Sequence, residues 1–419
     1  MHSAIPSSRV ELLAPAGNFE KLQTAVHFGA DAVYLGGHEF NLRRHSGNFS
    51  REELDAAVAY CHDRQVKAYV TCNIFPRNSD LAGVRRFLQD LATIRPDGVI
   101  VADPAVFSLA REVAPAVPIH ISTQANTTSL AAARFWKRLG ATRINAAREL
   151  SLEEIAVISA QGGLAVEVFV HGAMCMAYSG RCLLSAYLAD RDGNRGRCAH
   201  PCRWNYTLVE DKRPGTFMPL VETDRGSFIL TARDLCMIAH IPEMIASGVA
   251  ALKIEGRMKG IHYVATVVKA YREAIDAFYR QEPQDRSRDR GARALEAVNN
   301  RGYDTGFYFG APRSAENAAH AHIPGNTYRL VGKVLADNDG TAIALETRNR
   351  FFVGEIVEVI SPGRAIARCP VRSIRDAESR RIERARPGFE VTVDLGHACR
   401  RGDLLRRVRP PAEHNPNGT

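Results

Sequence analysis

The sequence of 419 residues lacks any run of roughly eighteen uninterrupted apolar residues, the length that crosses a bilayer as a helix. Its first residues, MHSAIPSSRV, contain no apolar core of the kind that a secretory signal needs. We therefore predict no membrane contact and a cytoplasmic location. The nine cysteines are an odd number without such a signal, which argues against a disulfide framework and for reduced thiols.

Several catalytic motifs are also missing. The chain has no His-Glu-x-x-His helix for a zinc hydrolase, no Gly-x-Ser-x-Gly nucleophile turn, no Walker phosphate loop and no Gly-x-Gly-x-x-Gly dinucleotide fingerprint. Ordinary hydrolase, kinase and dinucleotide-dependent activities therefore have no support from motifs. The Gly36-Gly37 pair could let a ligand approach the backbone, which makes Gly37 a candidate binding residue, although such a pair is more often a simple turn.

Five of the cysteines are concentrated in one part of the chain. Six, fifteen and thirty-seven residues separate Cys175, Cys182, Cys198 and Cys236, which is not the short paired spacing of a zinc finger. Thiolates from separate loops suit an iron–sulfur cluster, because the fold rather than a local hairpin can place them. The alternative is that these cysteines are small reduced core residues, but the Gly, Ser, Arg and His residues around them favour polar loops.

Positive charge is concentrated near the C-terminus. Between Arg364 and Arg409 the chain has thirteen arginines, no lysine and six acidic residues, so this segment carries +7 of the net +9. Arginine presents a planar fork of donors that matches phosphate, and such a local excess is expected of a surface that contacts RNA or DNA. The alternative is a solvated face in an arginine-rich protein.

Short apolar runs alternate with helical patterns over most of the chain. The runs that predict strands are Val10–Leu13, Ala32–Leu35, Lys67–Asn73, Gly98–Asp103, Ile119–Gln124, Arg143–Ala147, Ala165–His171 and Ala251–Glu255. Asn18, Ser50 and Ser151 are predicted helix N-caps between them. Eight strand–helix units predict the α/β class and a (β/α)8 TIM-like barrel, with the cysteine-rich segment inserted after the seventh strand.

A different pattern follows the barrel. Gln281–Arg293 is predicted to be a polar surface loop after a long helix over Gly260–Arg280. Further strands are predicted at Arg329–Leu335, Thr341–Thr347, Glu355–Ile360 and Phe389–Asp394, with Asn338-Asp339-Gly340 as a hairpin turn. We therefore predict a barrel domain with the cluster insertion over residues 1–325, a small all-β barrel domain that binds RNA over residues 326–410, and a disordered tail over residues 411–419.

The strand patterns indicate which side chains face the barrel interior. Glu167 and Lys253 point inward from neighbouring strands and could pair, while His120, Ser122 and Gln124 share one face of the fifth strand. Barrel interiors are usually filled with Val, Ile and Leu, so this polarity is unusual. The alternative to a binding role is a polar network that satisfies itself.

Chemistry in this fold belongs at the C-terminal ends of the strands. Side chains predicted to mark a pocket there are Gln124, Arg148, Glu149, His171, Glu255 and Arg257. Cationic side chains can clamp carboxylates, and His or Glu can move protons.

Several segments resemble peptidase family U-32, the so-called collagenase-like proteases. They are Glu11–Gly17, Ala32–Gly37, Phe40–Arg43, Ala147–Leu152, the signature from His171 to Cys182, and Lys253–Arg257. The resemblance covers nearly the whole chain, and the cysteine signature is highly specific. The resemblance includes the Pro201–Trp204 segment and the added C-terminal β domain. It implies a tRNA-modifying enzyme that hydroxylates the wobble uridine to 5-hydroxyuridine, depends on prephenate and carries a 4Fe-4S cluster.

The resemblance also implies roles for residues. Its cluster ligands fall on Cys175, Cys182, Cys198 and Cys236; relatives that act in oxygen-independent ubiquinone hydroxylation lack the second cysteine of the local pair, which favours Cys198 over Cys202. Independently of the resemblance, the strand-end positions predict Arg148, His171, Glu255 and Arg257 as catalytic residues. The glycine pair and the polar strand faces predict Gly37, Gln124, Glu167 and Lys253 as cofactor-binding residues.

The expected partners are tRNA, a small organic acid, and an electron donor or cluster-assembly proteins. The alternatives are a U-32-type peptidase, a hydroxylase of ribosomal RNA cytidine or of a ubiquinone precursor, and a noncatalytic scaffold that carries the cluster. The ribosomal RNA branch is considerably longer than this chain, so length favours tRNA. No nucleophile, base and orienting group can be assembled from motifs here, which weakens the peptidase alternative. The sequence leaves the oligomeric state open.

Overall fold

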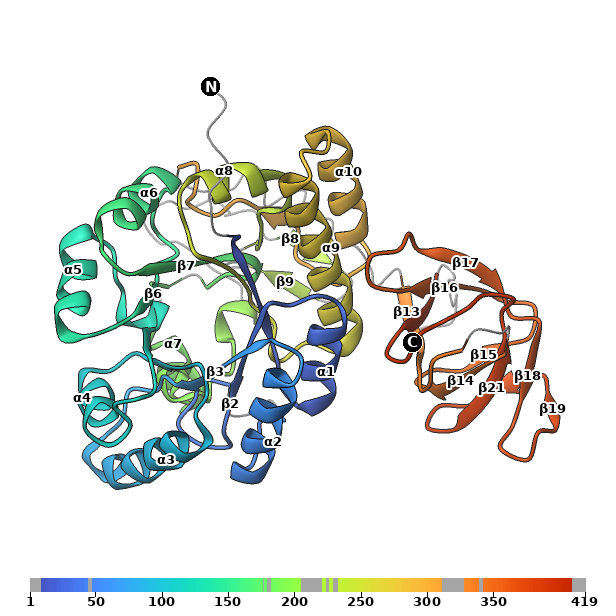
Figure 1. Ribbon diagram of the computed structural model, residues 1–419, viewed down its shortest axis with the longest axis horizontal. Helices are drawn as coiled ribbons and strands as arrows, with labels where there is room; N and C mark the ends of the chain where they lie inside the picture. The colour runs from blue at the N-terminus through green and yellow to red at the C-terminus, as the bar shows by residue number, and fades with distance from the viewer. Residues whose placement is uncertain are drawn as a thin grey trace. The chain divides into compact units, whose positions relative to one another are not determined.

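The computed structural model describes residues 9–43, 47–175, 177–178, 182–204, 221–223, 226–228, 233–310, 328–338 and 342–408. The chain forms two compact units (Figure 1). The first contains residues 1–292 and 300–323, and the second contains residues 293–299 and 324–419. The predicted boundary at residues 325 and 326 and the predicted tail at 411–419 lie outside the described residues.

The first unit contains a closed barrel of eight parallel strands. These are β1 (Glu11–Pro15), β2 (Ala32–Gly36), β3 (Lys67–Cys72), β4 (Gly98–Val101), β5 (Ile119–Ile121), β6 (Arg143–Asn145), β7 (Ala165–Ala173) and β11 (Ala251–Ile254). Each strand pairs with the next, and β11 pairs with both β7 and β1, which closes the barrel. The predicted TIM-like barrel is therefore confirmed. The fifth strand ends earlier than predicted, because Thr123–Ala125 turns into a 3-10 helix, η2, that contains Gln124.

Helices follow the strands around the barrel (Figure 1). They are α1 (Phe19–His27), α2 (Arg51–His62), α3 (Leu81–Ile94), α4 (Pro104–Val113), α5 (Leu130–Leu139), α6 (Leu152–Gln161), α8 (Ile241–Ala246) and α9 (Ile261–Tyr279), with short 3-10 helices η1 (Asn78–Asp80) and η5 (Ile238–His240). The Asn18 side chain accepts a backbone hydrogen bond at the start of α1, and Ser50 and Ser151 form capping boxes with Glu53 and Glu154. The three predicted N-caps are confirmed. Within the described residues, none of the helices has the length and apolar character needed to cross a bilayer.

One stretch predicted to be a loop is a helix. The prediction for Gln281–Arg293 is wrong, because α10 spans Gln284–Leu295. Its arginine, glutamine and alanine residues are good helix formers. The sequence nevertheless has few apolar residues at helical spacing here, so the hydrophobic pattern does not indicate a helix. Tertiary contacts hold the helix: a Cβ on Gly291 would lie 2.6 Å from the Ile238 side chain, and Arg288 donates a hydrogen bond to Glu243 at 3.4 Å.

The cysteine-rich segment is inserted between β7 and β11, as predicted. It contains α7 (Leu184–Ala189), η3 (Gly193–Arg195), η4 (Pro201–Arg203), a hairpin of β8 (Val221–Thr223) and β9 (Gly226–Phe228), and β10 (Asp234–Cys236). Strand β10 runs antiparallel to the end of β7, with Cys236 opposite His171, and β12 (Tyr303–Asp304) pairs in parallel with β10. The insertion therefore begins and ends at the C-terminal end of β7.

A network of buried charges fills the N-terminal part of the barrel. Lys253 Nζ donates to Glu167 Oε1 at 2.7 Å, which confirms the predicted pair. Arg143 Nη1 bridges Glu167 at 3.3 Å and Glu11 at 2.6 Å, and the Tyr69 hydroxyl donates to Glu11 at 2.9 Å. Burial opposes ionisation of Glu11, but the hydrogen bond and charge of Arg143 outweigh it and hold the pKa of Glu11 below its usual value. Glu167 and Lys253 thus belong to an internally paired network.

The second unit is an antiparallel β structure. Its strands are β13 (Tyr328–Val334), β14 (Ala342–Thr347), β15 (Phe351–Phe352), β16 (Ile356–Ile360), β17 (Ala367–Pro370), β18 (Ser373–Arg375), β19 (Arg381–Ile382), β20 (Arg384–Ala385), β21 (Glu390–Asp394) and β22 (Leu404–Val408). Eight of them form one sheet in the order β17-β16-β22-β13-β14-β21-β18-β19, and β15 pairs with β20. In the described residues β17 and β19 are the sheet edges, so the predicted small β domain is a half-barrel around a core that includes Val331, Leu345 and Val393. Asp339 and Gly340 of the predicted hairpin turn lie outside the described residues.

We predict that Lys253→Met lowers the free energy of unfolding of the barrel by about 3–5 kcal/mol, because it leaves Glu167 in a buried site with one of its two cations removed. Denaturant titration followed by circular dichroism measures this loss. Adding Glu167→Leu should restore much of the stability, since no buried charge is then left without its partner.

The matched control is Lys67→Met. Lys67 binds Glu11 at 3.0 Å from a position where 56% of its side chain is exposed, so its removal should cost at most about 1 kcal/mol. Equal losses for the two lysine variants would contradict the proposed importance of the buried pair.

Candidate functional site

One carboxylate lies among several cations at the C-terminal end of the barrel. Glu255 follows β11, and its Oε1 accepts hydrogen bonds from Arg43 Nε at 3.3 Å and Nη2 at 3.1 Å. Arg148 Nη2 lies 4.0 Å from Glu255 Oε2, and the Tyr34 hydroxyl lies 3.5 Å from the same oxygen. Two predicted catalytic residues, Glu255 and Arg148, are thus brought together. Arg43 and Tyr34 were not predicted, although both lie within the segments that resemble the family.

The protonation state of Glu255 follows from these contacts. Burial would raise the pKa of its carboxyl group, but the charges of Arg43 and Arg148 outweigh burial and hold this pKa below the usual value. Burial, together with the charge of Glu255, raises the pKa of Tyr34 well above its usual value. At neutral pH the site therefore offers an ionised carboxylate beside a neutral phenol. Glu255 is suited to hold cations in place rather than to exchange protons near pH 7.

Arg148 has one hydrogen-bond donor that is not used within the described residues. Its guanidinium stacks 3.9 Å from the centre of the Phe169 ring, and its Nη1 donates to the Ala173 carbonyl at 3.1 Å. Its Nε is buried and has no hydrogen-bond partner among the described residues. Because buried donors are nearly always satisfied, an unused donor beside Glu255 indicates a place where a ligand acceptor fits.

Arg257 is held by neutral oxygens. Its guanidinium donates to Thr71 Oγ1 and Asn41 Oδ1, both at 3.0 Å, and to Asn48 Oδ1 at 2.5 Å. Burial lowers the pKa of Arg257 to about 10, so the side chain is still charged at neutral pH. A Cβ on Gly36 would lie 2.7 Å from Arg257 Nη2, so glycine is required for this approach. Arg257 thus adds a positive charge and fixes the loop that follows β2.

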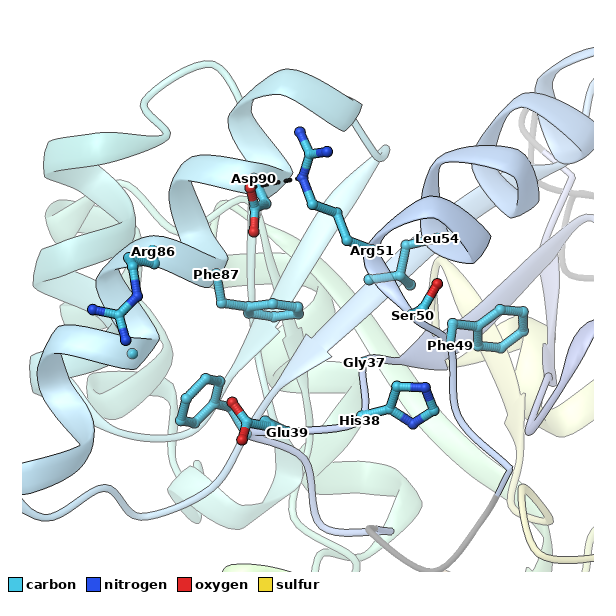
Figure 2. Close-up of a pocket in the computed structure, with 12 residues that line it drawn as sticks. Gly37, His38, Glu39, Phe49, Ser50, Arg51, Leu54, Arg86, Phe87 and Asp90 are labelled. Carbon is cyan, nitrogen blue, oxygen red and sulfur yellow. Dashed lines mark hydrogen bonds and ion pairs between the residues drawn. The ribbon is translucent and has the colours of Figure 1, made fainter.

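Gly37 faces a different space, outside the barrel. It lines a pocket of about 240 Å³ between the loop after β2, the start of α2 and helix α3. Figure 2 shows Phe87 reaching from α3 toward the loop that carries Gly37 and His38. A Cβ on Gly37 would lie 2.9 Å from the Phe87 ring and 3.8 Å from Leu54, so this glycine allows close aromatic packing. The two glycines of the pair therefore serve different contacts, and only Gly36 adjoins the charged cluster.

His171 lies among aromatic rings. The rings around it belong to Tyr263, Tyr271 and Tyr303, with centroid distances of 5.9, 5.5 and 5.4 Å. Burial, with a smaller effect from the charge of Lys259, lowers the pKa of His171 to about 3, so the imidazole is neutral at physiological pH. The structure joins His171 to the charged cluster through the backbone, where the Glu255 amide donates to the His171 carbonyl at 2.8 Å.

The remaining predicted pocket residues lie at the same end of the barrel. Gln124 accepts hydrogen bonds from Ser122 and, at 3.4 Å, from Asn73. Asn73 in turn accepts from the Leu42 amide at 3.3 Å, which ties η2 to the loop after β2. Glu149, in the segment after β6, is half-buried. Gln124 therefore supports the loops around the pocket.

Two of the predicted cluster cysteines lie beside the charged cluster. Cys236 is in β10 opposite His171, and Cys175 follows β7 by two residues. The Glu255 carboxylate is the main cause that raises the pKa of Arg43, and the Cys175 thiol acts in the same direction. Both thiols are therefore at the mouth of the barrel.

The other two cysteines flank the short helix η3. Asn194 Nδ2 donates to the Cys182 carbonyl at 3.1 Å, and a Cβ on Gly193 would lie 3.4 Å from Cys198 Cβ. Within the described residues, no three His, Cys, Asp or Glu side chains form a group that could hold a metal ion. The donors nevertheless fit the chemistry of an iron–sulfur cluster, since all four are free cysteines with soft sulfur atoms, three from connecting segments and Cys236 from β10. Cys202, in η4, is also half-buried, and the choice of Cys198 over it stays a prediction.

These features define a class: a TIM-like barrel with a cationic mouth, a cysteine-rich insertion after its seventh strand and a separate antiparallel β unit. The model of Peptidase family U32 matches residues 17–318, and that of the Peptidase family U32 C-terminal domain matches residues 326–406. The chain belongs to peptidase family U32, as its motifs predicted.

Relatives of the chain carry more than one kind of name. The chain is 40% identical over 386 residues to tRNA hydroxylation protein P1 of Bacillus subtilis (strain 168), covering 92% of this chain and 91% of the relative. It is 36% identical to tRNA hydroxylation protein P of Escherichia coli (strain K12), covering 84% and 86%. It is also 32% identical to a protein named collagenase from Porphyromonas gingivalis (strain ATCC BAA-308 / W83), covering 95% and 97%.

We predict that Glu255→Gln lowers the free energy of unfolding by about 2 kcal/mol at pH 7, because charge-assisted hydrogen bonds are lost. The pKa of Glu255 is depressed in the folded state, so its stabilisation is fully present above the unfolded value of about 4.3 and is lost as the pH falls through the lower folded value. Denaturant titrations between pH 7 and pH 3 should show the variant and the wild type converging.

Glu153→Gln provides the control, since Glu153 is an exposed residue in the first turn of α6. Its effect should stay within about 0.5 kcal/mol at every pH. A difference between Glu255→Gln and the wild type that does not change with pH would show that the charge of Glu255 is not what stabilises this site.

Proposed function

We propose that this chain hydroxylates tRNA, converting the wobble uridine to 5-hydroxyuridine, with prephenate as co-substrate and a 4Fe-4S cluster. The observation that carries the proposal is the 40% identity, over 92% of the chain, to a protein named tRNA hydroxylation protein P1. The match also covers 91% of that relative. The positive charges of the site give a chemical reason to expect a small acid as its ligand.

The charges at the barrel mouth favour an anionic ligand. Arg43, Arg148 and Arg257 lie around the carboxylate of Glu255. A small dicarboxylic acid would balance the excess positive charge, and its carboxylate could accept from the unused Nε of Arg148. Arg257 and Gln124 hold the loops that shape this space, and Glu255 keeps Arg43 and Arg148 in position.

The proposed cluster ligands are Cys175, Cys182, Cys198 and Cys236. A bound 4Fe-4S cluster would supply single-electron chemistry, which calls for an electron donor among the partners. Burial raises the pKa of Cys236 to about 11, so its thiol must lose a proton when it becomes a ligand.

The second unit offers an RNA-binding surface, but not all of its arginines are available. Arg406 is buried and binds Glu358 at 2.9 Å, and Arg407 binds Glu355. Several exposed arginines have no side-chain partner in the described part of the chain, among them Arg381, Arg384, Arg386, Arg400 and Arg401. These exposed guanidinium groups are suited to phosphate contacts that position tRNA without reading its sequence.

The second candidate function is that of a peptidase, favoured by the relative named collagenase. Within the insertion, Cys198 Sγ lies 4.0 Å from His200 Nδ1. Proteolysis by protein that contains no iron would support this alternative over RNA hydroxylation.

We expect anaerobically purified protein to be brown and to contain about four irons per chain, because four thiolate ligands favour a cubane cluster. Iron analysis of single alanine variants at Cys175, Cys182, Cys198 and Cys236 should show most of the iron lost. Cys202→Ala is the control and should keep its iron. Stoichiometric zinc without iron in the wild type would refute the proposed cluster.

Mass spectrometry of tRNA nucleosides tests the activity itself. Cells without the gene should lose 5-hydroxyuridine and its derivatives, and the wild-type gene should restore them. Arg148→Gln should restore less than about one-tenth, because the small acid loses a charge-assisted contact of roughly 1.5–3 kcal/mol. Arg138→Gln, on the outer helix α5, should restore them fully. Normal 5-hydroxyuridine in cells without the gene would refute the proposed activity.

A further inference from the structure

The cysteine-rich insertion is fastened to the barrel mouth. Arg195, in η3, forms a two-pronged salt bridge with Asp80 at 2.6 and 3.1 Å. The next residue, Gly196, lies so close to the loop after β2 that a Cβ there would be 2.5 Å from the Asn41 carbonyl oxygen. Asn41 also holds Arg257. The surface of the insertion is therefore fixed next to the candidate site.

This surface exposes large aromatic side chains. Tyr187 on α7 is 89% exposed, Tyr178 is 57% exposed, and Trp204, directly after η4, is 41% exposed. Helix α7 packs against η4, and the Ala199 amide donates to Ser185 Oγ at 2.9 Å, so Tyr187 and Trp204 belong to one folded piece. Two exposed aromatic side chains on one folded piece are suited to an interaction surface.

The charge of the segment favours a nucleic acid. Residues 178–204 contain five arginines, no lysine and two aspartates, a net charge of +3, and one of these arginines, Arg195, is neutralised by Asp80. Arg197 is exposed, and the described residues provide no partner for its side chain. Aromatic faces combined with arginine are typical of proteins that hold unpaired nucleotides, since bases stack on the rings while cations follow the backbone.

We propose that Tyr187 and Trp204 form a stacking surface for the unpaired bases of an RNA loop on either side of the base that enters the barrel. This rests on the proposed function and adds to it the contact that holds the substrate loop. A base that enters the barrel must leave its stack, and its neighbours then lose a stacking partner. The aromatic surface beside the mouth replaces that partner.

Tyr187→Ala in the full-length, iron-loaded protein tests the proposal. The probe is a fluorescent anticodon stem–loop RNA with an unmodified wobble uridine, titrated by anisotropy at several salt concentrations. The variant should bind about tenfold more weakly, and Tyr187→Phe should bind as the wild type does. The slope of log Kd against log salt should not change, whereas Arg384→Glu should reduce that slope.

Phe135→Ala is the matched control, because Phe135 is an aromatic residue that is 46% exposed on α5, which is not part of the insertion. It should leave RNA affinity unchanged, and all variants should keep the melting temperature and iron content of the wild type. Wild-type affinity for Tyr187→Ala would overturn the stacking surface, and so would a reduced salt slope, since the contact would then be to phosphate.

Two further outcomes separate this proposal from the proposed function. If the wild type hydroxylates tRNA and binds the stem–loop, but Tyr187→Ala binds equally well, only the stacking surface is wrong. If the wild type neither binds the stem–loop nor hydroxylates tRNA, both fail. Unchanged RNA affinity with slower cleavage of a collagen peptide would assign the surface to a peptide partner and also overturn the proposal.

Discussion

The ion cluster around Glu255 fixes the geometry of the barrel mouth. Its carboxylate is largely withdrawn from water, and burial alone would favour the neutral acid, so the charge depends on Arg43 and Arg148. These cations come from the segments after β2 and β6, while Glu255 itself follows β11. One ionised group therefore joins three segments that are far apart in the sequence. Because Arg148 retains an unused donor, the same cluster that orders the mouth leaves it ready to hold a further acceptor.

Two polar layers inside the barrel differ in how completely they are satisfied. In the lower layer, formed by Glu11, Arg143, Glu167 and Lys253, the charged groups are paired with one another. In the upper layer, formed at the C-terminal end of the barrel, three arginines lie around the Glu255 carboxylate. Lys253 lies 4.5 Å from the centre of the Tyr34 ring, and the Tyr34 hydroxyl reaches Glu255, so the two layers are in contact. The paired charges of the lower layer support the fold. The excess of arginines in the upper layer leaves positive charge there for a ligand, so chemistry can occur in that layer.

Positive charge in this chain serves three purposes. Buried arginines such as Arg143 and Arg406 form salt bridges with internal carboxylates. Arg195 fastens the insertion to the barrel through Asp80. Exposed arginines, of which Arg384 is one example in the β unit, remain free to meet an anionic surface. A count of arginines in the sequence therefore overstates the charge that an RNA would encounter, because the count does not separate paired from exposed groups.

The sequence by itself determined the features that depend on near neighbours. The eight strands followed from short apolar runs, the N-caps at Ser50 and Ser151 from a carboxylate three residues later, and the Glu167–Lys253 pair from strand alternation in two adjacent strands. Only the tertiary structure decided the contact of Arg43 with Glu255, which are 212 residues apart, and the placement of His171 beside Tyr271, 100 residues away. It also decided that the polar stretch at α10 is helical. The physical reason is that closing the barrel brings these groups together, and the environment of a side chain, which sets its charge and partners, is not encoded in the residues next to it.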